Sequence, residues 1–115
     1  MDTEKLLIIV KQALEDKKAQ DIKVINVRKL CNFTDFMIVA TGNTARQVVA
    51  LAQNVIDEAK KQGHQSLGDE GRQVGDWVLV DLGDAIVHLM QPETRNFYQL
   101  EKLWSEMGGD SHLSQ

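Results

Sequence analysis

Two aspartates and a histidine interrupt the otherwise apolar stretch Trp77–Met90, which reads WVLVDLGDAIVHLM. A Gly-Asp pair in its middle favours a two-residue hairpin turn, because glycine readily adopts the positive φ angle that such turns need. In the register that pairs Leu82 with Ala85, Asp81 and His88 are diagonal neighbours on one face of the hairpin. Diagonal neighbours lie roughly 7 to 8 Å apart, so Asp81 could orient His88 as an acid–base couple.

A hydrolytic site built on that couple would also need a nucleophile. Cys31 is the only thiol of the chain, and nothing near it in the sequence would activate it as a nucleophile or place it beside His88. The sequence therefore disfavours hydrolytic catalysis, and we interpret His88 as a structural partner of Asp81.

A second enzymatic interpretation uses Gly42 and the helix that follows it as a phosphate cradle. Asp81 and Asp84 would then bind magnesium for nucleotidyl transfer. Their spacing argues against this, because strand residues point to the same side only when an even number separates them. The Thr-Gly-Asn turn at Gly42 also lacks the lysine and the glycine density of a P-loop. We expect no catalytic residue, metal or cofactor, and a nucleotide-binding enzyme remains the alternative.

Charge is distributed unevenly along the chain. The total is 13 Lys and Arg against 17 Asp and Glu, a net charge of −4, which disfavours direct binding to nucleic acid. The segment 69–84 holds five acids and a single base, Arg72. The acids are Asp69, Glu70, Asp76, Asp81 and Asp84. This segment favours a basic partner.

The last predicted helix, residues 92–107, carries an aromatic side chain that its apolar stripe leaves out. The stripe, expected to pack on the sheet, comprises Phe97, Leu100, Leu103, Trp104 and Met107. Tyr98 falls on the opposite face, one turn from Lys102 and beside Arg95. Such a tyrosine either lies along a neighbouring loop or forms a binding hot spot. A tryptophan at a strand start, such as Trp77, is more often a core residue than a contact residue, but the acids that precede it favour exposure.

Apolar periodicity and turn residues predict the elements that must position these side chains. We expect helices at 3–18, 45–61 and 92–107, strands at 22–28, 36–41, 77–82 and 85–90, and a loop at 63–75 with a short edge strand near 64–67. This order predicts a single α/β domain over residues 1–107, with a mixed β-sheet covered by helices. Residues 108–115 are expected to form a disordered tail.

The whole-chain totals suit a cytoplasmic protein. A chain of 115 residues fits one domain. Its single cysteine cannot form an internal disulfide, which agrees with a reducing compartment. The apolar run at residues 6–10 is too short for a signal peptide or a membrane span.

Five stretches of the chain resemble the Iojap family of bacterial ribosomal silencing factors. They are DIKVINV, FTDFMIVATGNTARQV, GDEG, DWVLVDLGDAIVHLM and RNFYQLEKLW, and together they cover nearly everything from Asp21 to Trp104. The resemblance implies a nucleotidyltransferase-like fold without the catalytic site. It also implies binding to the large ribosomal subunit through that subunit's protein fourteen, which blocks joining of the small subunit and represses translation when nutrients are scarce.

The resemblance places the contact region at Trp77, Tyr98 and Lys102. Charge adds four acids to this expected partner-binding set, because a ribosomal protein is basic. They are Glu70, Asp76, Asp81 and Asp84. Two other uses of the same surface stay open: a generic adaptor for another basic protein, and a homodimer contact in the free protein.

Overall fold

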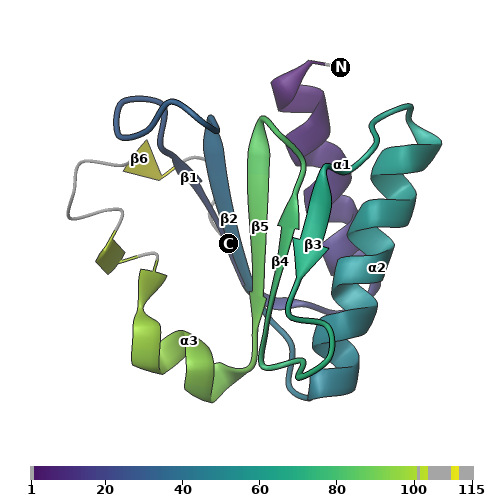
Figure 1. The fold of residues 1–115 in the computed structure, drawn as a ribbon, viewed down its shortest axis with the longest axis vertical. Helices are drawn as coiled ribbons and strands as arrows, with labels where there is room; N and C mark the ends of the chain where they lie inside the picture. Colours follow the sequence, from purple (N-terminus) through teal and green to yellow (C-terminus); the bar gives the residue numbers. More distant parts are fainter. Residues whose placement is uncertain (1, 101, 104–109, 112–115) are drawn as a thin grey trace.

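Helices and strands alternate along most of the chain. The structure is a computed structural model, and it describes residues 2–100, 102–103 and 110–111. The elements are α1 (Thr3–Asp16), β1 (Gln20–Asn26), β2 (Phe36–Thr41), α2 (Ala45–Lys61), β3 (Gly68–Glu70), β4 (Trp77–Asp81), β5 (Ala85–Met90), α3 (Pro92–Tyr98) and β6 (Asp110–Ser111). The described strands form one sheet in the order β3-β4-β5-β2-β1-β6 (Figure 1). The predicted α/β fold with a mixed sheet is confirmed.

Helices α1 and α2 lie side by side on one face of this sheet (Figure 1). Each begins at a residue whose side chain caps it: Asp2 accepts a hydrogen bond from the Glu4 amide, and Thr44 accepts one from the Gln47 amide. The buried residues of the two helices recur at helical spacing. They are Leu6, Leu7, Val10, Ala13 and Leu14 of α1, and Val48, Leu51, Ala52, Val55 and Ala59 of α2. This amphipathic pattern places the main core between the helices and the sheet.

Strands β2 and β5 form the centre of the sheet and pair in parallel, while the other neighbouring strands pair antiparallel. Every residue of both central strands is buried, as expected for continuous apolar runs. The prediction of a strand at 36–41 that is buried on both faces is confirmed.

The β4–β5 hairpin has the register that its turn predicts. Asp81 pairs with Ile86 and Leu79 with His88, and the Leu82 amide donates to the carbonyl of Ala85 at 2.9 Å. The edge strand was predicted too early: β3 occupies Gly68–Glu70 rather than 64–67. The reason is that the His64 amide donates to the Ala59 carbonyl at the end of α2 and so is not available to a strand.

The prediction of one continuous helix over 92–107 is wrong. Helix α3 ends at Tyr98, because Gln99 adopts a left-handed conformation with φ 49°. A helical segment resumes at Leu100 and includes Lys102 and Leu103, whose amide donates to the Gln99 carbonyl. Trp104 and Met107 lie outside the described residues.

The expected packing of the last helix is also wrong. Phe97 and Leu103, placed on the packed stripe by the sequence, are 79% and 50% exposed, whereas Arg95 is only 8% exposed. The break at Gln99 ends the continuous stripe on which the prediction depended, and a hydrogen bond from Arg95 to the side chain of Thr41 turns the opposite face inward.

Two residues of the predicted disordered tail, Asp110 and Ser111, form β6 and pair with β1. The rest of that tail lies outside the described residues. Among the helices of the described residues, none is long and apolar enough to cross a membrane.

Candidate partner-binding surface

The face of the sheet opposite α1 and α2 carries three of the predicted contact residues: Trp77, Asp81 and Glu70. Strand β4 alternates strictly: Val78 and Val80 are buried against the helices, while Trp77, Leu79 and Asp81 are half-buried on the other face. Glu70 of β3 pairs with Leu79 and therefore shares this face. We call it the open face of the sheet.

An aromatic cluster of Trp77, Phe97 and Tyr98 lies on the open face. The ring centroids of Trp77 and Tyr98 are 4.9 Å apart, with the planes tilted by 48°. Tyr98 and Phe97 meet edge to face, also at 4.9 Å. Tyr98 is 52% exposed, so the cluster presents aromatic surface to solvent. The hairpin and the last helix do share a surface, as the sequence suggested for Trp77 and Tyr98.

Two hydrogen bonds made by Gln91 help to bring Tyr98 to Trp77. The Gln91 amide donates to the Asp76 carbonyl at 2.9 Å, and its side chain donates to the Gly75 carbonyl at 3.1 Å. Gln91 is the N-cap residue of α3. The start of α3 is therefore fixed to the segment that leads into Trp77.

A buried imidazole lies behind the cluster. The indole Nε1–H of Trp77 donates to Nδ1 of His88 at 3.0 Å, and Nε2 of His88 lies 2.9 Å from the sulfur of Met37. Because Nδ1 accepts a hydrogen bond, the ring proton must sit on Nε2. Burial lowers the pKa of His88 to about 4, so the ring is neutral at pH 7 and both nitrogens are engaged.

The expected partnership of Asp81 with His88 is wrong. Asp81 Oδ1 accepts a hydrogen bond from the Gly83 amide at 2.9 Å, which closes an Asx turn at the hairpin. The short side chain of Asp81 reaches the amide of Gly83, two residues along the chain, more easily than it reaches His88 across the strands. His88 therefore bonds to Trp77 and Met37 instead.

The predicted acids do not form one patch. Glu70 borders a surface hollow of about 260 Å³ together with Gly71, Trp77 and Leu79. Asp81 is on the same face, and Asp76 is exposed immediately before Trp77. Glu70 and Asp76 are thus the acids beside the aromatic cluster, whereas Asp81 lies on the same face at the turn end of β4.

The other two acids of the segment point elsewhere. Asp69 forms a salt bridge of 3.2 Å with Arg72, which also donates to Gln53 of α2. Asp84, in the hairpin turn, accepts a hydrogen bond from Thr3 of α1 at 3.2 Å. The turn is at the end of the hairpin opposite Trp77, so Asp84 lies away from the aromatic cluster.

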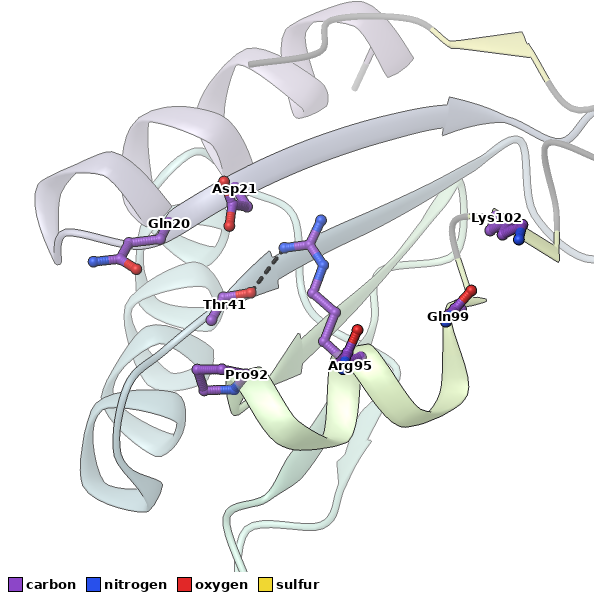
Figure 2. Close-up of a pocket in the computed structure, with 8 residues that line it drawn as sticks. Gln20, Asp21, Thr41, Pro92, Arg95, Gln99 and Lys102 are labelled. Carbon is purple, nitrogen blue, oxygen red and sulfur yellow. Dashed lines mark hydrogen bonds between the residues drawn. The ribbon is translucent and has the colours of Figure 1, made fainter.

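Lys102 and Arg95 belong to a second hollow, of about 510 Å³, beside the other edge of α3. Figure 2 shows Arg95 reaching from α3 to Thr41 at the end of β2, where Nη1 donates to the hydroxyl at 2.8 Å. Gln20 and Asp21 at the start of β1 complete this hollow, and Lys102 lies on its rim. The structure therefore places Lys102 at the hollow that Arg95 shares with Gln20 and Asp21, and Tyr98 beside Trp77 of β4.

The turn at Gly42 has a packing role. A Cβ atom there would lie 3.0 Å from Val48 Cγ2 and 3.2 Å from Leu51 Cδ1, so glycine permits the close approach of α2. Two amides at this turn are bonded within the chain: the Asn43 amide donates to the side chain of Gln47, and the Gln47 amide donates to the hydroxyl of Thr44. The described residues contain no group of three His, Cys, Asp or Glu side chains suited to a metal ion.

The partner-binding set predicted from the sequence omits two residues of the open face, Leu79 and Gly71. Leu79 follows from the alternation that starts at Trp77. Gly71 has φ 97°, and a Cβ there would collide with the Trp77 carbonyl oxygen; only the close approach of the two backbones reveals its role.

Comparison with known proteins adds the decisive observation. The family model described as "Ribosomal silencing factor during starvation" matches residues 1–114. The chain belongs to this family, RsfS. A relative in Haemophilus influenzae, named Ribosomal silencing factor RsfS, is 47% identical over 100 residues, which cover 87% of this chain and 98% of the relative. The predicted resemblance is confirmed.

A solved structure and a mouse protein are also similar to this chain. A crystal structure of a Chromobacterium violaceum protein superposes with a TM-score of 0.89 at 43% identity, covering 91% of this chain and 88% of that one. A mouse relative, 35% identical over 89% of this chain and 46% of its own length, is named "Mitochondrial assembly of ribosomal large subunit protein 1".

Proposed function

We propose that this protein binds the large ribosomal subunit through its protein fourteen, prevents the small subunit from joining, and so represses translation in the cytoplasm. The observation that carries the proposal is the aromatic cluster of Trp77, Phe97 and Tyr98, exposed on the open face of a chain that belongs to the RsfS family. The family name indicates action on the ribosome, and the name of the mouse relative refers to the large subunit.

The chemistry of the open face supports a protein partner. Tyrosine and tryptophan dominate binding hot spots, because they bury large areas at a small entropic cost. Glu70 and Asp76 lie beside the cluster and Asp81 farther along the same face, and acids at the rim of an interface guide a basic partner and select it. Ribosomal proteins are basic, so protein fourteen has the charge that this rim favours.

Steric exclusion is the mechanism that we propose. A domain whose described residues measure 35 × 34 × 23 Å blocks subunit joining if it occupies the surface where the small subunit docks. Such an inhibitor needs affinity but no chemical turnover. The proposal therefore assigns no catalytic residue and no cofactor to the chain.

A sucrose-gradient experiment tests the proposal. Large subunits are incubated with the protein, small subunits and magnesium are added, and the fraction of joined ribosomes is recorded. We expect the wild-type protein to migrate with large subunits and to suppress joining. Normal joining without co-migration would contradict the proposed function.

Two variants locate the contact within the same experiment. Tyr98→Ala removes an exposed ring of the cluster, and Lys102→Glu reverses a cation on the rim of the neighbouring hollow. Each should weaken large-subunit binding by tenfold or more, about the effect of a single hot-spot residue. Phe33→Ala and Lys5→Glu are matched controls, because both residues are exposed outside the cluster. Equal binding by all four variants would show that another face makes the contact.

A further inference from the structure

His88 occupies a place that the proposed docking role does not yet use. It lies on β5, opposite Leu79, and is 6% exposed. The rings of Trp77 and His88 are 5.8 Å apart, and the bond from indole to imidazole joins the aromatic cluster to the sheet. We propose that His88 is a positioning residue, which holds the Trp77 indole in the orientation that Tyr98 stacks on and a partner recognises. This inference rests on the proposed docking function.

A half-buried tryptophan at a strand start needs such a constraint. An indole at a surface can rotate about two side-chain bonds, and ordering it on association costs affinity. Here two contacts on different parts of the ring restrict it: the Nε1–H bonds to His88, and the ring stacks with Tyr98. The surface is thereby organised before a partner arrives.

The bond requires one tautomer of His88, and Met37 provides for it. Nδ1 can accept from Trp77 only if Nε2 carries the proton. Nε2 faces the polarisable sulfur of Met37, a weak acceptor, at 2.9 Å. Met37 is buried on β2, which is adjacent to β5. Three neighbouring strands therefore contribute to the orientation of one surface indole.

Two substitutions at His88 can separate the effect of the hydrogen-bond acceptor at Nδ1 from the effect of removing the ring. In His88→Asn, the amide oxygen replaces Nδ1 at nearly the same distance from Cγ, so an acceptor for the indole is kept. In His88→Leu, no acceptor remains. Val87→Ala is the matched control, because Val87 is buried on the same strand but faces α1 and α2, so its loss weakens the core without touching the indole.

Two measurements are made on the full chain. The first is solvent exchange of the Trp77 indole N–H by NMR, with the signal assigned through Trp77→Phe. The second is the affinity for isolated large subunits. We expect His88→Leu to speed indole exchange at least tenfold and to weaken binding about three- to tenfold, as for one side chain that must be ordered on binding. His88→Asn should keep most of the slow indole exchange and most of the affinity of the wild type. Val87→Ala should change neither the exchange rate nor the affinity.

The outcomes distinguish this inference from the docking proposal. If Trp77→Ala abolishes binding while His88→Leu binds like wild type, the positioning role is overturned and the docking face stands. If Trp77→Ala and Tyr98→Ala both bind like wild type, the docking face itself is wrong. Equal exchange rates in His88→Leu and the wild type, or no difference between the Asn and Leu variants, would also overturn the positioning role.

Discussion

The two faces of the β4–β5 hairpin differ in how their residues are held. On the face toward α1 and α2, Val78 and Val80 are fully buried in an apolar core. On the open face, Trp77, Leu79 and Asp81 from the same strand are half-buried, and two of them are held by hydrogen bonds to His88 and Gly83. Burial without side-chain hydrogen bonding gives one face its stability. Specific polar bonds give the other a defined surface.

The largest effect on stability should come from the helix-covered face. Leu51 of α2 is fully buried, so Leu51→Ala should lower the free energy of unfolding by about 2–5 kcal/mol through lost burial and a cavity. Urea denaturation measures the loss, and the affinity for large subunits, measured without denaturant and well below the unfolding temperature, should be unchanged. A loss of less than about 1 kcal/mol would contradict the division between the two faces.

Acid should lower the free energy of unfolding, because His88 on the open face is neutral when folded. Its pKa is about 4 in the folded state because burial disfavours the charged ring, against about 6.5 when unfolded. Between these values the unfolded chain binds more protons, so stability falls as the pH drops from about 6.5 toward 4 and levels off below it. The full loss is about 3 kcal/mol.

Denaturation of wild type and His88→Asn across that pH range measures this contribution. Subtracting the two curves removes the effect of the carboxylates, which titrate in both proteins. Parallel curves would mean that His88 protonates as easily in the folded protein as in the unfolded chain.

Two glycines with similar φ angles test whether the backbone beside Trp77 is closely packed. Gly71 has φ 97° and abuts the Trp77 carbonyl, whereas Gly63 has φ 84° and open space where a Cβ would be added. Gly63→Ala should cost only backbone strain, roughly 1 kcal/mol. Gly71→Ala adds a steric conflict and should cost about 1–2 kcal/mol more, with a change in Trp77 fluorescence. Equal losses would argue that the backbone beside Trp77 moves freely.

The smallest effect on stability should follow removal of an exposed ring. Tyr98→Ala should lower the unfolding free energy by about 1 kcal/mol or less, because half of the side chain is in solvent and mainly the stacking with Trp77 and Phe97 is lost. Thermal unfolding checks this against Leu51→Ala. A loss as large as that of Leu51→Ala would place Tyr98 in the core rather than on a binding surface.

Local chemistry made much of the fold predictable. The Gly-Asp turn set the hairpin register, and the apolar run at 36–41 formed a strand buried on both faces. Helix α2 begins after the capping residue Thr44 and ends before Gly63, as the sequence indicated. In each case the deciding residues lie within a few positions of the element that they shape.

Partners distant in the sequence account for the errors. Arg95 of α3 is buried because Thr41, at the end of β2, accepts its hydrogen bond, and no helical period reveals such a partner. The left-handed Gln99 is not a glycine or asparagine, the residues that usually mark this conformation. His88 bonds to Trp77 and Met37, whereas the diagonal position across the hairpin suggested Asp81. The site residues themselves stay a prediction until binding is measured.

The parallel pairing of β2 with β5 also orders events during biosynthesis. Phe36 pairs with Ala85, so β5 is made long after its partner β2, and non-local pairing of this kind must await the later segment. Trp77, His88 and Tyr98 can meet only after β5 and α3 have left the ribosome. A nascent chain shorter than this lacks the surface that we propose for binding, so on this proposal the chain must extend past α3 before it can bind a large subunit.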